Sequence, residues 1–226
     1  MTDDHPVVMS DNGDDRSTRR PHKPALRIAH RTSGLVLLAF ATVHMANHLV
    51  GLHGQADHIA FMAAIRPLYR NPVVEPILLT LVMVQVLSGL TLVARGWRGR
   101  TGIVAWLQVI SGLYLSAFLL NHVASILYGR IALTLDTDFR FAAAGFRVAG
   151  FYWFFAPYYL LAIAALFIHL GCAAYWLTHA RDPRLSVALL AAFCGTGVVF
   201  GVFVIAALSG LLYAVDIPTA YLRTYR

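Results

Sequence analysis

Long apolar stretches alternate with short polar segments along the whole chain. A helix that crosses a bilayer needs about 20 predominantly apolar residues. Five stretches meet this requirement, namely residues 32–52, 73–94, 103–127, 151–177 and 187–213. Apart from Glu75, none of them contains an aspartate, glutamate, lysine or arginine. The pattern predicts an all-α membrane protein, a bundle of five transmembrane helices.

The segments between and before these stretches are too short for a separate soluble domain. Residues 1–26 are polar and charged, and we expect a flexible N-terminal tail there, followed by one transmembrane bundle over residues 27–226. The tail has no apolar stretch beside a cleavage site and does not resemble a signal peptide. Residues 57–68 and 139–150 mix apolar and basic side chains, which is typical of helices that lie at a membrane interface.

The composition agrees with a membrane protein. Hydrophobic residues make up 58% of the chain and charged residues only 13%, whereas soluble domains carry about 25% charged residues. This excludes a disordered protein, a nucleic-acid-binding module and an ordinary soluble enzyme. Cys172 and Cys194 lie within apolar runs, without the spacing of a disulfide or a metal site, and are expected to be core residues.

The net charge of +7 could suggest a nucleic-acid partner. In a membrane protein it is better explained by basic loop residues that set the orientation, and we expect no nucleic-acid partner. Eleven of the 18 Lys and Arg residues precede the first span or lie in the short loops at residues 95–100 and 181–184, and seven lie elsewhere. Positively charged short loops stay on the cytoplasmic side. We therefore expect a cytoplasmic N-terminus and an external C-terminus.

The first and third predicted spans contain an internal repeat with an offset of 78 residues. Residues 33–46 and 111–124 agree at eight of 14 positions, and the shared positions include Ser-Gly, Phe and His. The repeated histidines are His44 and His122. Because both spans run in the same direction, these two side chains are expected at the same depth in the membrane.

Paired histidines on two membrane helices are typical of haem ligation. Ionisable residues inside a bilayer are costly and usually mark function, and imidazole is a common axial ligand of haem iron. His44 and His122 therefore predict bis-histidine binding of a b-type haem, the alternative being that each hydrogen-bonds a neighbouring helix. His48, one turn from His44, could replace His44 as the ligand or support it. The repeat aligns His48 with Ile126, which favours His44; His53 and His58 are expected to be exposed loop residues.

A second pair of polar positions lies nearer the cytoplasmic side. His169 in the fourth span and Gln85 in the second are each ten residues from the cytoplasmic ends at His179 and Arg95. Glutamine is a poor haem ligand. A site here could be empty, bind haem through His169 alone, or accept a quinone or lipid; equally, His169 and Gln85 could simply hydrogen-bond each other.

This layout resembles the cytochrome b membrane anchor of succinate dehydrogenases and fumarate reductases, in its single-subunit five-helix form. That family carries one axial histidine on each of its first four helices, and His44, His122 and His169 fall on three of these positions. Gln85-xxx-Gly89 stands where the family has His-xxx-Gly, so one haem is expected and the second depends on Gln85 and His169. The resemblance covers about residues 27–178, and the fifth span carries no motif.

A second resemblance concerns quinone. His30-Arg31-Thr32-Ser33-Gly34 is similar to a His-Arg-x-Ser-Gly motif beside the quinone pocket of two-subunit anchors in the same family. This implies quinone binding by His30, Arg31 and Ser33. The alternative is that the positive charge here only keeps this end of the helix on the cytoplasmic side. At the other side of the membrane, Asp57, His58 and Glu75 are candidate proton carriers, although a solvated carboxylate is the simpler explanation of Glu75.

The resemblance also implies partners and a location. The partners are a flavoprotein and an iron–sulfur subunit in a complex of the bacterial inner membrane, and higher oligomers of that complex are possible. The chain itself has no dinucleotide-binding glycine loop and no cysteine cluster, so alone it is expected to be non-catalytic. Two other functions fit the sequence: a haem b subunit of another quinone-linked dehydrogenase, and a haem-free anchor or transport protein.

Overall fold

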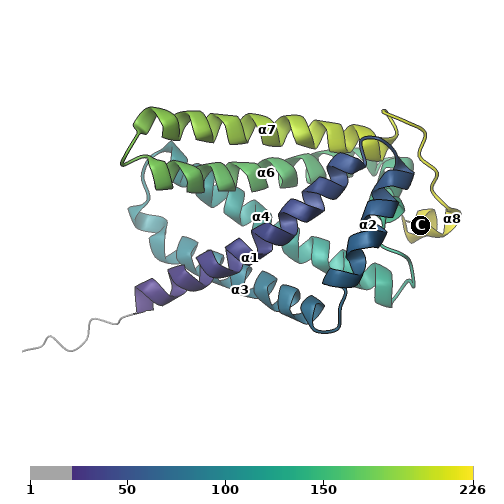
Figure 1. Cartoon of the computed structure of the whole chain (residues 1–226), viewed down its shortest axis with the longest axis horizontal. Helices are drawn as coiled ribbons and strands as arrows, with labels where there is room; N and C mark the ends of the chain where they lie inside the picture. Colours follow the sequence, from purple (N-terminus) through teal and green to yellow (C-terminus); the bar gives the residue numbers. More distant parts are fainter. Residues whose placement is uncertain (1–21, 226) are drawn as a thin grey trace, which may run out of the picture.

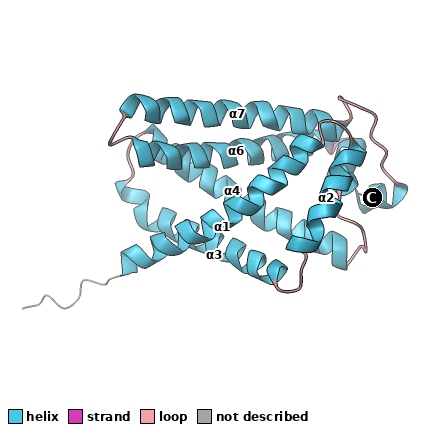
Figure 2. Cartoon of the chain, viewed as in Figure 1, coloured by secondary structure: helices cyan, strands magenta, loops and turns pink. Residues whose placement is uncertain are grey.

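The computed structural model describes residues 22–225, which are helical for most of their length and contain no strand (Figure 2). The elements in chain order are α1 (His22–Val50), α2 (Gln55–Tyr69), α3 (Val74–Gly96), η1 (Trp97–Gly99), α4 (Ile103–Ile131), α5 (Phe139–Ala144), η2 (Gly145–Arg147), α6 (Tyr152–Thr178), α7 (Pro183–Ser209), α8 (Thr219–Leu222) and η3 (Arg223–Tyr225). Most of the predicted tail lies outside the described residues, and residues 22–26 belong to α1.

Five helices are long and apolar enough to cross a membrane, which confirms the predicted fold class. They cover Ala25–Val50, Val74–Gly99, Ile103–Ile131, Tyr152–Thr178 and Pro183–Ser209. The cytoplasmic location of the N-terminus stays a prediction. Helices are also found at both predicted interfacial segments: α2 covers the first, and the second divides into α5 and η2 and ends before residue 150.

The last span was predicted four residues too late, at 187–213, because hydropathy gives less information about helix ends than capping does. The Asp182 carboxylate accepts hydrogen bonds from the backbone N–H groups of Arg184 and Leu185, both at 2.9 Å, and Pro183 occupies the first turn. At the other end Gly210 has φ 79°, the left-handed conformation that terminates helices.

The tightest packing lies between α6 and α7, which run antiparallel side by side (Figure 1). Their glycines permit this close approach: a methyl group added at Gly197 would lie 2.6 Å from the Phe167 side chain. The apolar core joins these two helices to α5, through Phe139, Phe146, Ile163, Phe200, Val204 and Leu208.

The other three long helices are packed more loosely. Helix α1 lies along α3, and α4 along α6, while α1 and α4 make hardly any backbone contact with each other. Within the described part of α1 the buried residues are polar, Ser33 and Asn47. Apolar residues such as Leu35, 68% exposed, face outward. The inner surface of α1 therefore carries polar side chains, while α3 and α4 bury Ser88 and Ser111 beside valines. Helix α2 lies across one end of these helices (Figure 1).

Candidate functional site

Four imidazole rings gather near the α2 end of the bundle, and we call them the histidine cluster: His44 and His48 on α1, His58 on α2 and His122 on α4. The ring centres of His44 and His122 are 6.2 Å apart, with their planes tilted by 58°. His48 lies beside His44, with 5.0 Å between ring centres, and His58 lies 5.3 Å beyond His48. The two histidines that the repeat predicted as a pair are thus neighbours.

An aromatic ring one turn away supports each histidine of that pair. Phe40 stacks on His44 with an interplanar angle of 8°, and Phe118 stacks on His122 with an angle of 14°. Both contacts join residues four apart on a helix, whose side chains lie on one face. The repeated Phe of the sequence therefore has a structural meaning, because it limits the orientation of the repeated His.

The ring nitrogens of this pair have no partner in the described structure. Hydrogen bonds in the histidine cluster join His58 to Asn47, and none reaches His44, His48 or His122. The ring centres of His44 and His122 lie 6.2 Å apart, and imidazole is a common ligand of haem iron. These two residues are therefore the ones that could hold an iron between α1 and α4. A bare metal ion has no comparable site, since no group of three or more His, Cys, Asp or Glu is placed to hold one within the described residues.

His58 is buried, so the expectation of an exposed loop residue was wrong for it, whereas His53 is exposed. His58 is only 4% exposed, and Asn47 Nδ2 lies 3.2 Å from its Nε2. Burial, and secondarily the neighbouring His44, lowers the pKa of His58 to about 4. The sequence held one signal of this burial: His58 and Met62, also buried, are four residues apart and share one face of the predicted helix.

A second polar group, the amide cluster, lies toward the opposite end of the same helices. It consists of His30 on α1, Gln85 on α3, Gln108 on α4 and His169 on α6. Gln85 links α3 to α1, because its Oε1 accepts a hydrogen bond of 2.6 Å from Ser33 and its Nε2 lies 3.3 Å from His30 Nε2. The Nδ1 atom of His30 lies 3.0 Å from Ser88 Oγ on α3.

The other half of the amide cluster links α4 to α6. His169 Nδ1 lies 3.2 Å from both the backbone carbonyl of Gln108 and the hydroxyl of Ser111. The side chain of Gln108 accepts a hydrogen bond of 2.9 Å from Trp176 Nε1. The suggested hydrogen bond between Gln85 and His169 is absent from the described residues, because each is bonded within its own helix pair.

The three residues predicted to bind quinone do not form one group. His30 and Ser33 belong to the inner surface of α1, where Ser33 is 2% exposed and its hydroxyl donates to Gln85. Arg31 lies on an exposed face of the same helix. Successive residues of a helix point about 100° apart, so one ligand would meet His30 and Ser33 from a different side than Arg31.

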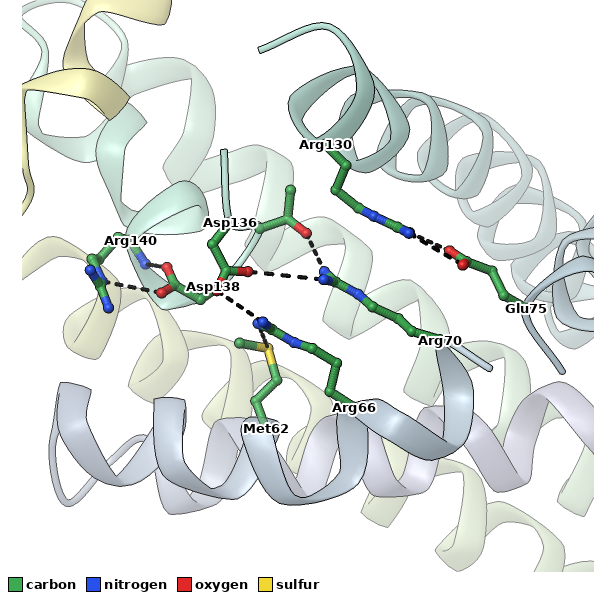
Figure 3. Close-up of polar contacts among 9 residues, drawn as sticks. Met62, Arg66, Arg70, Glu75, Arg130, Asp136, Asp138 and Arg140 are labelled. Carbon is green, nitrogen blue, oxygen red and sulfur yellow. Dashed lines mark hydrogen bonds and ion pairs between the residues drawn. The ribbon is translucent and has the colours of Figure 1, made fainter. Parts of the chain in front are cut away.

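A charged network covers the α2 end (Figure 3). Arg130 on α4 forms a forked ion pair with Glu75 on α3, so the one carboxylate of the predicted spans is paired. Arg66 of α2 contacts Asp136 at 2.9 Å, and Arg70 donates to Thr137 at 2.6 Å. These contacts could not be predicted from the sequence, because their partners are 55 to 70 residues apart.

Asp138 forms a further charged contact at the start of α5. Its carboxylate accepts a hydrogen bond of 2.8 Å from the backbone N–H of Arg140 and lies 3.1 Å from the Arg140 guanidinium. Burial raises the pKa of Asp138, against the opposing effects of the Arg140 N–H and side chain. Together these separate contacts join α3 to α4 through Glu75 and Arg130, and α2 to the segment before α5 through Arg66 and Arg70.

No family model matches the chain, and comparisons with curated proteins and with solved structures give no significant match either.

Proposed function

We propose that the chain is a haem b-binding membrane subunit that transfers electrons between a partner dehydrogenase and quinone. The observation that carries the proposal is the His44–His122 pair, whose ring centres lie 6.2 Å apart on two helices related by an internal repeat. The pair would hold one haem b through its two axial positions. Haem bound in this way carries one electron at a time and leaves no coordination position for oxygen.

The physical support is the lack of partners for these imidazoles. His44 and His122 are half-buried, and their ring nitrogens have no hydrogen-bond partner in the described structure, so these nitrogens can serve as ligands. Phe40 and Phe118 hold the two rings from outside by stacking. Since α1 and α4 barely touch along their backbones, a flat ligand between them would supply contacts that the two helices otherwise lack.

His44 is favoured over His48 by the same geometry. The ring next to His122 is that of His44, while His48 lies between His44 and His58. In this proposal His48 packs behind the ligand and limits its movement. His58 and Asn47 close the cluster toward α2.

The identity of the complex rests on the resemblance of residues 27–178 to succinate dehydrogenase and fumarate reductase anchors. On that basis the partners are a flavoprotein and an iron–sulfur subunit, and the location is the bacterial inner membrane with the N-terminus in the cytoplasm. Quinone binding is proposed for the cytoplasmic end of α1, where Arg31 supplies a positive charge at an exposed position beside His30.

The first test is an absorbance spectrum of the full chain purified in detergent, oxidised and then reduced with dithionite. We expect a reduced b-type band in the native protein and in His53→Ala, a control in an exposed histidine outside the spans. The absorbance band of this haem should be lost almost completely in His44→Ala and in His122→Ala, and retained in His48→Ala.

Two results would contradict the proposal. A native chain without haem would leave a haem-free anchor or a transport protein, and a band that survives both substitutions would move the haem elsewhere. Co-purification separates the two haem-carrying alternatives: a flavoprotein that reduces fumarate or oxidises succinate supports the anchor, and a different dehydrogenase supports the other quinone-linked complex.

A further inference from the structure

One side of helix α4 is left exposed by the rest of the described chain. The helix packs mainly against α6 and less against α3, and its exposed residues recur at intervals of three, four or seven positions. We call this row the α4 seam; it consists of Ile110, Ala117, Asn121, Ala124, Tyr128 and Ile131. Residues at this spacing share one face of a helix, and it is the spacing with which two helices pack side by side.

Asn121 is the unusual member of the α4 seam, because its side chain is a polar amide and it lies deep in the span. It is four residues from Ala117, the midpoint of α4, which corresponds to about 6 Å along the helix axis. The hydrocarbon core of a bilayer is about 30 Å thick, so in a bilayer centred on α4 this side chain is out of reach of bulk water. Polar side chains at such a depth usually face the inside of a bundle and not the lipid.

The hydrogen bonds of Asn121 are incomplete within one copy of the chain. Its Nδ2 donates at 2.8 Å to the Tyr158 hydroxyl on α6, while its Oδ1 has no partner among the described residues. Exposed threonines in the spans differ, because Thr42 and Thr80 each donate at 2.8 Å to the carbonyl one turn earlier in their own helix. The amide oxygen of Asn121 cannot be satisfied in this way, since the N–H groups of its helix already bond the backbone. It needs a donor from outside the chain.

The other residues of the α4 seam permit another helix to come close. Ala117 and Ala124 lie one turn before and one turn after Asn121, and small residues let helix backbones approach near enough for polar side chains to bond across the contact. The seam also has no charge that would repel a second copy. The only aspartate, glutamate, lysine or arginine of α4 is Arg130, which lies off the seam and pairs with Glu75 of the same chain.

We propose that the α4 seam joins two copies of the chain, with Asn121 of one copy hydrogen-bonded to Asn121 of the other. Two copies in one membrane have the same orientation, so a two-fold axis along the membrane normal brings identical residues together at one depth. The amide is self-complementary: each Nδ2 has a second N–H besides the one given to Tyr158, and each Oδ1 can accept it. A single asparagine in a helix seam fixes the register and the number of helices. The inference does not depend on haem binding.

The first test is disulfide cross-linking of the full chain in its membrane. Ala124→Cys places a thiol on the α4 seam, and two such thiols join only where their Cα atoms come within about 7 Å of each other. We expect a covalent dimer when membranes with this variant are oxidised with copper phenanthroline. The matched control is Ala192→Cys, at an exposed alanine of α7. That variant should stay monomeric, as should the native chain with Cys172 and Cys194.

The second test measures dissociation of the dimer in mild detergent by analytical ultracentrifugation. Asn121→Leu keeps the side-chain volume but removes the amide, and the dissociation constant should rise about tenfold, the effect of losing two hydrogen bonds between membrane helices. Two control variants should dissociate no more readily than the native chain. Tyr158→Phe removes only the hydrogen bond within the chain, and Thr80→Val removes an exposed hydroxyl on α3.

Three results would overturn the proposal. A monomeric native chain, or equal cross-linking of Ala124→Cys and Ala192→Cys, would leave the α4 seam to lipid or to a helix of a different subunit. Dissociation that Tyr158→Phe raises as much as Asn121→Leu would mean that Asn121 acts only through its contact with α6. If Asn121→Leu does not fold, the comparison of the two cysteine variants decides the question, because it leaves Asn121 in place.

Discussion

The histidine cluster and the amide cluster lie on the same helices but hold their rings by different means. In the amide cluster, hydrogen bonds with serine, glutamine and backbone groups fix the orientation of His30 and His169. In the histidine cluster, Phe40 and Phe118 fix the orientation of His44 and His122 by stacking and leave the ring nitrogens without partners. Hydrogen-bonded polar groups such as those of the amide cluster join helix pairs by themselves, whereas the histidine cluster is the part to which we assign a bound haem.

The largest expected difference between the clusters concerns pH. Because the pKa of His58 is about 4 in the folded chain and about 6.5 in an unfolded one, the unfolded state takes up the proton first on acidification. Stability from neutral His58 is complete above about pH 6.5 and falls by about 3 kcal/mol as the pH approaches 4. Thermal unfolding in detergent between pH 7 and pH 4 measures this loss.

His58→Gln is the matched variant for the pH measurement, since glutamine does not titrate and can still hydrogen-bond Asn47. Its stability should fall less steeply with acid than that of the native chain, whereas His53→Gln, at an exposed position, should behave like the native chain. Equal slopes in the native chain and in His58→Gln would show that His58 is not a buried neutral group.

A smaller effect should follow from breaking the amide cluster at Gln85. Gln85→Leu keeps the side-chain volume but removes the hydrogen bonds that join α3 to Ser33 and His30. We expect a loss of about 1–2 kcal/mol, because hydrogen bonds between membrane helices contribute about 0.6 kcal/mol each on average and buried partners are left unpaired. The measurement is unfolding of the purified chain by denaturing detergent.

Gln108→Leu provides the control for Gln85→Leu. The Gln108 side chain accepts one hydrogen bond, from Trp176, which is 49% exposed, and its backbone carbonyl still holds His169 after substitution. Its loss of stability should therefore be smaller. An equal or larger loss in Gln108→Leu would mean that Gln85 does not link α1 to α3 as described.

The smallest effect is expected from the stacking residues of the histidine cluster. Phe118→Leu removes the ring that stacks on His122 and should cost about 0.5–1 kcal/mol. Phe40→Leu should cost slightly less, since Phe40 meets one further ring, Tyr69 at 5.6 Å between ring centres, whereas Phe118 meets two, Tyr158 at 4.9 Å and Tyr159 at 6.5 Å. Thermal unfolding compares the two variants, and chemical labelling of His122 with diethyl pyrocarbonate should rise in Phe118→Leu. Unchanged labelling would argue against stacking as the means of orientation.

The histidine pair could be predicted because two local patterns coincided. The repeat placed His44 and His122 at equivalent positions on helices that run the same way, and the repeated Phe residues carry the stacking that orients them. The relation between Gln85 and His169 could not be predicted in this way. Equal depth does not show which neighbouring helix each side chain contacts. In the structure Gln85 on α3 bonds to α1, and His169 on α6 bonds to α4.

Amino-acid sequence alone determined the five spans, because a bilayer imposes one minimum length on any apolar helix and the five apolar stretches exceed it. It also determined the depth of the polar residues, which follows from their distance to the helix ends. The tertiary structure decided which of these residues meet: His58 enters the histidine cluster, His30 bonds Ser88, and Arg130 pairs with Glu75. Such contacts depend on how each helix is rotated and which helix lies beside it, and no short stretch of sequence contains that information.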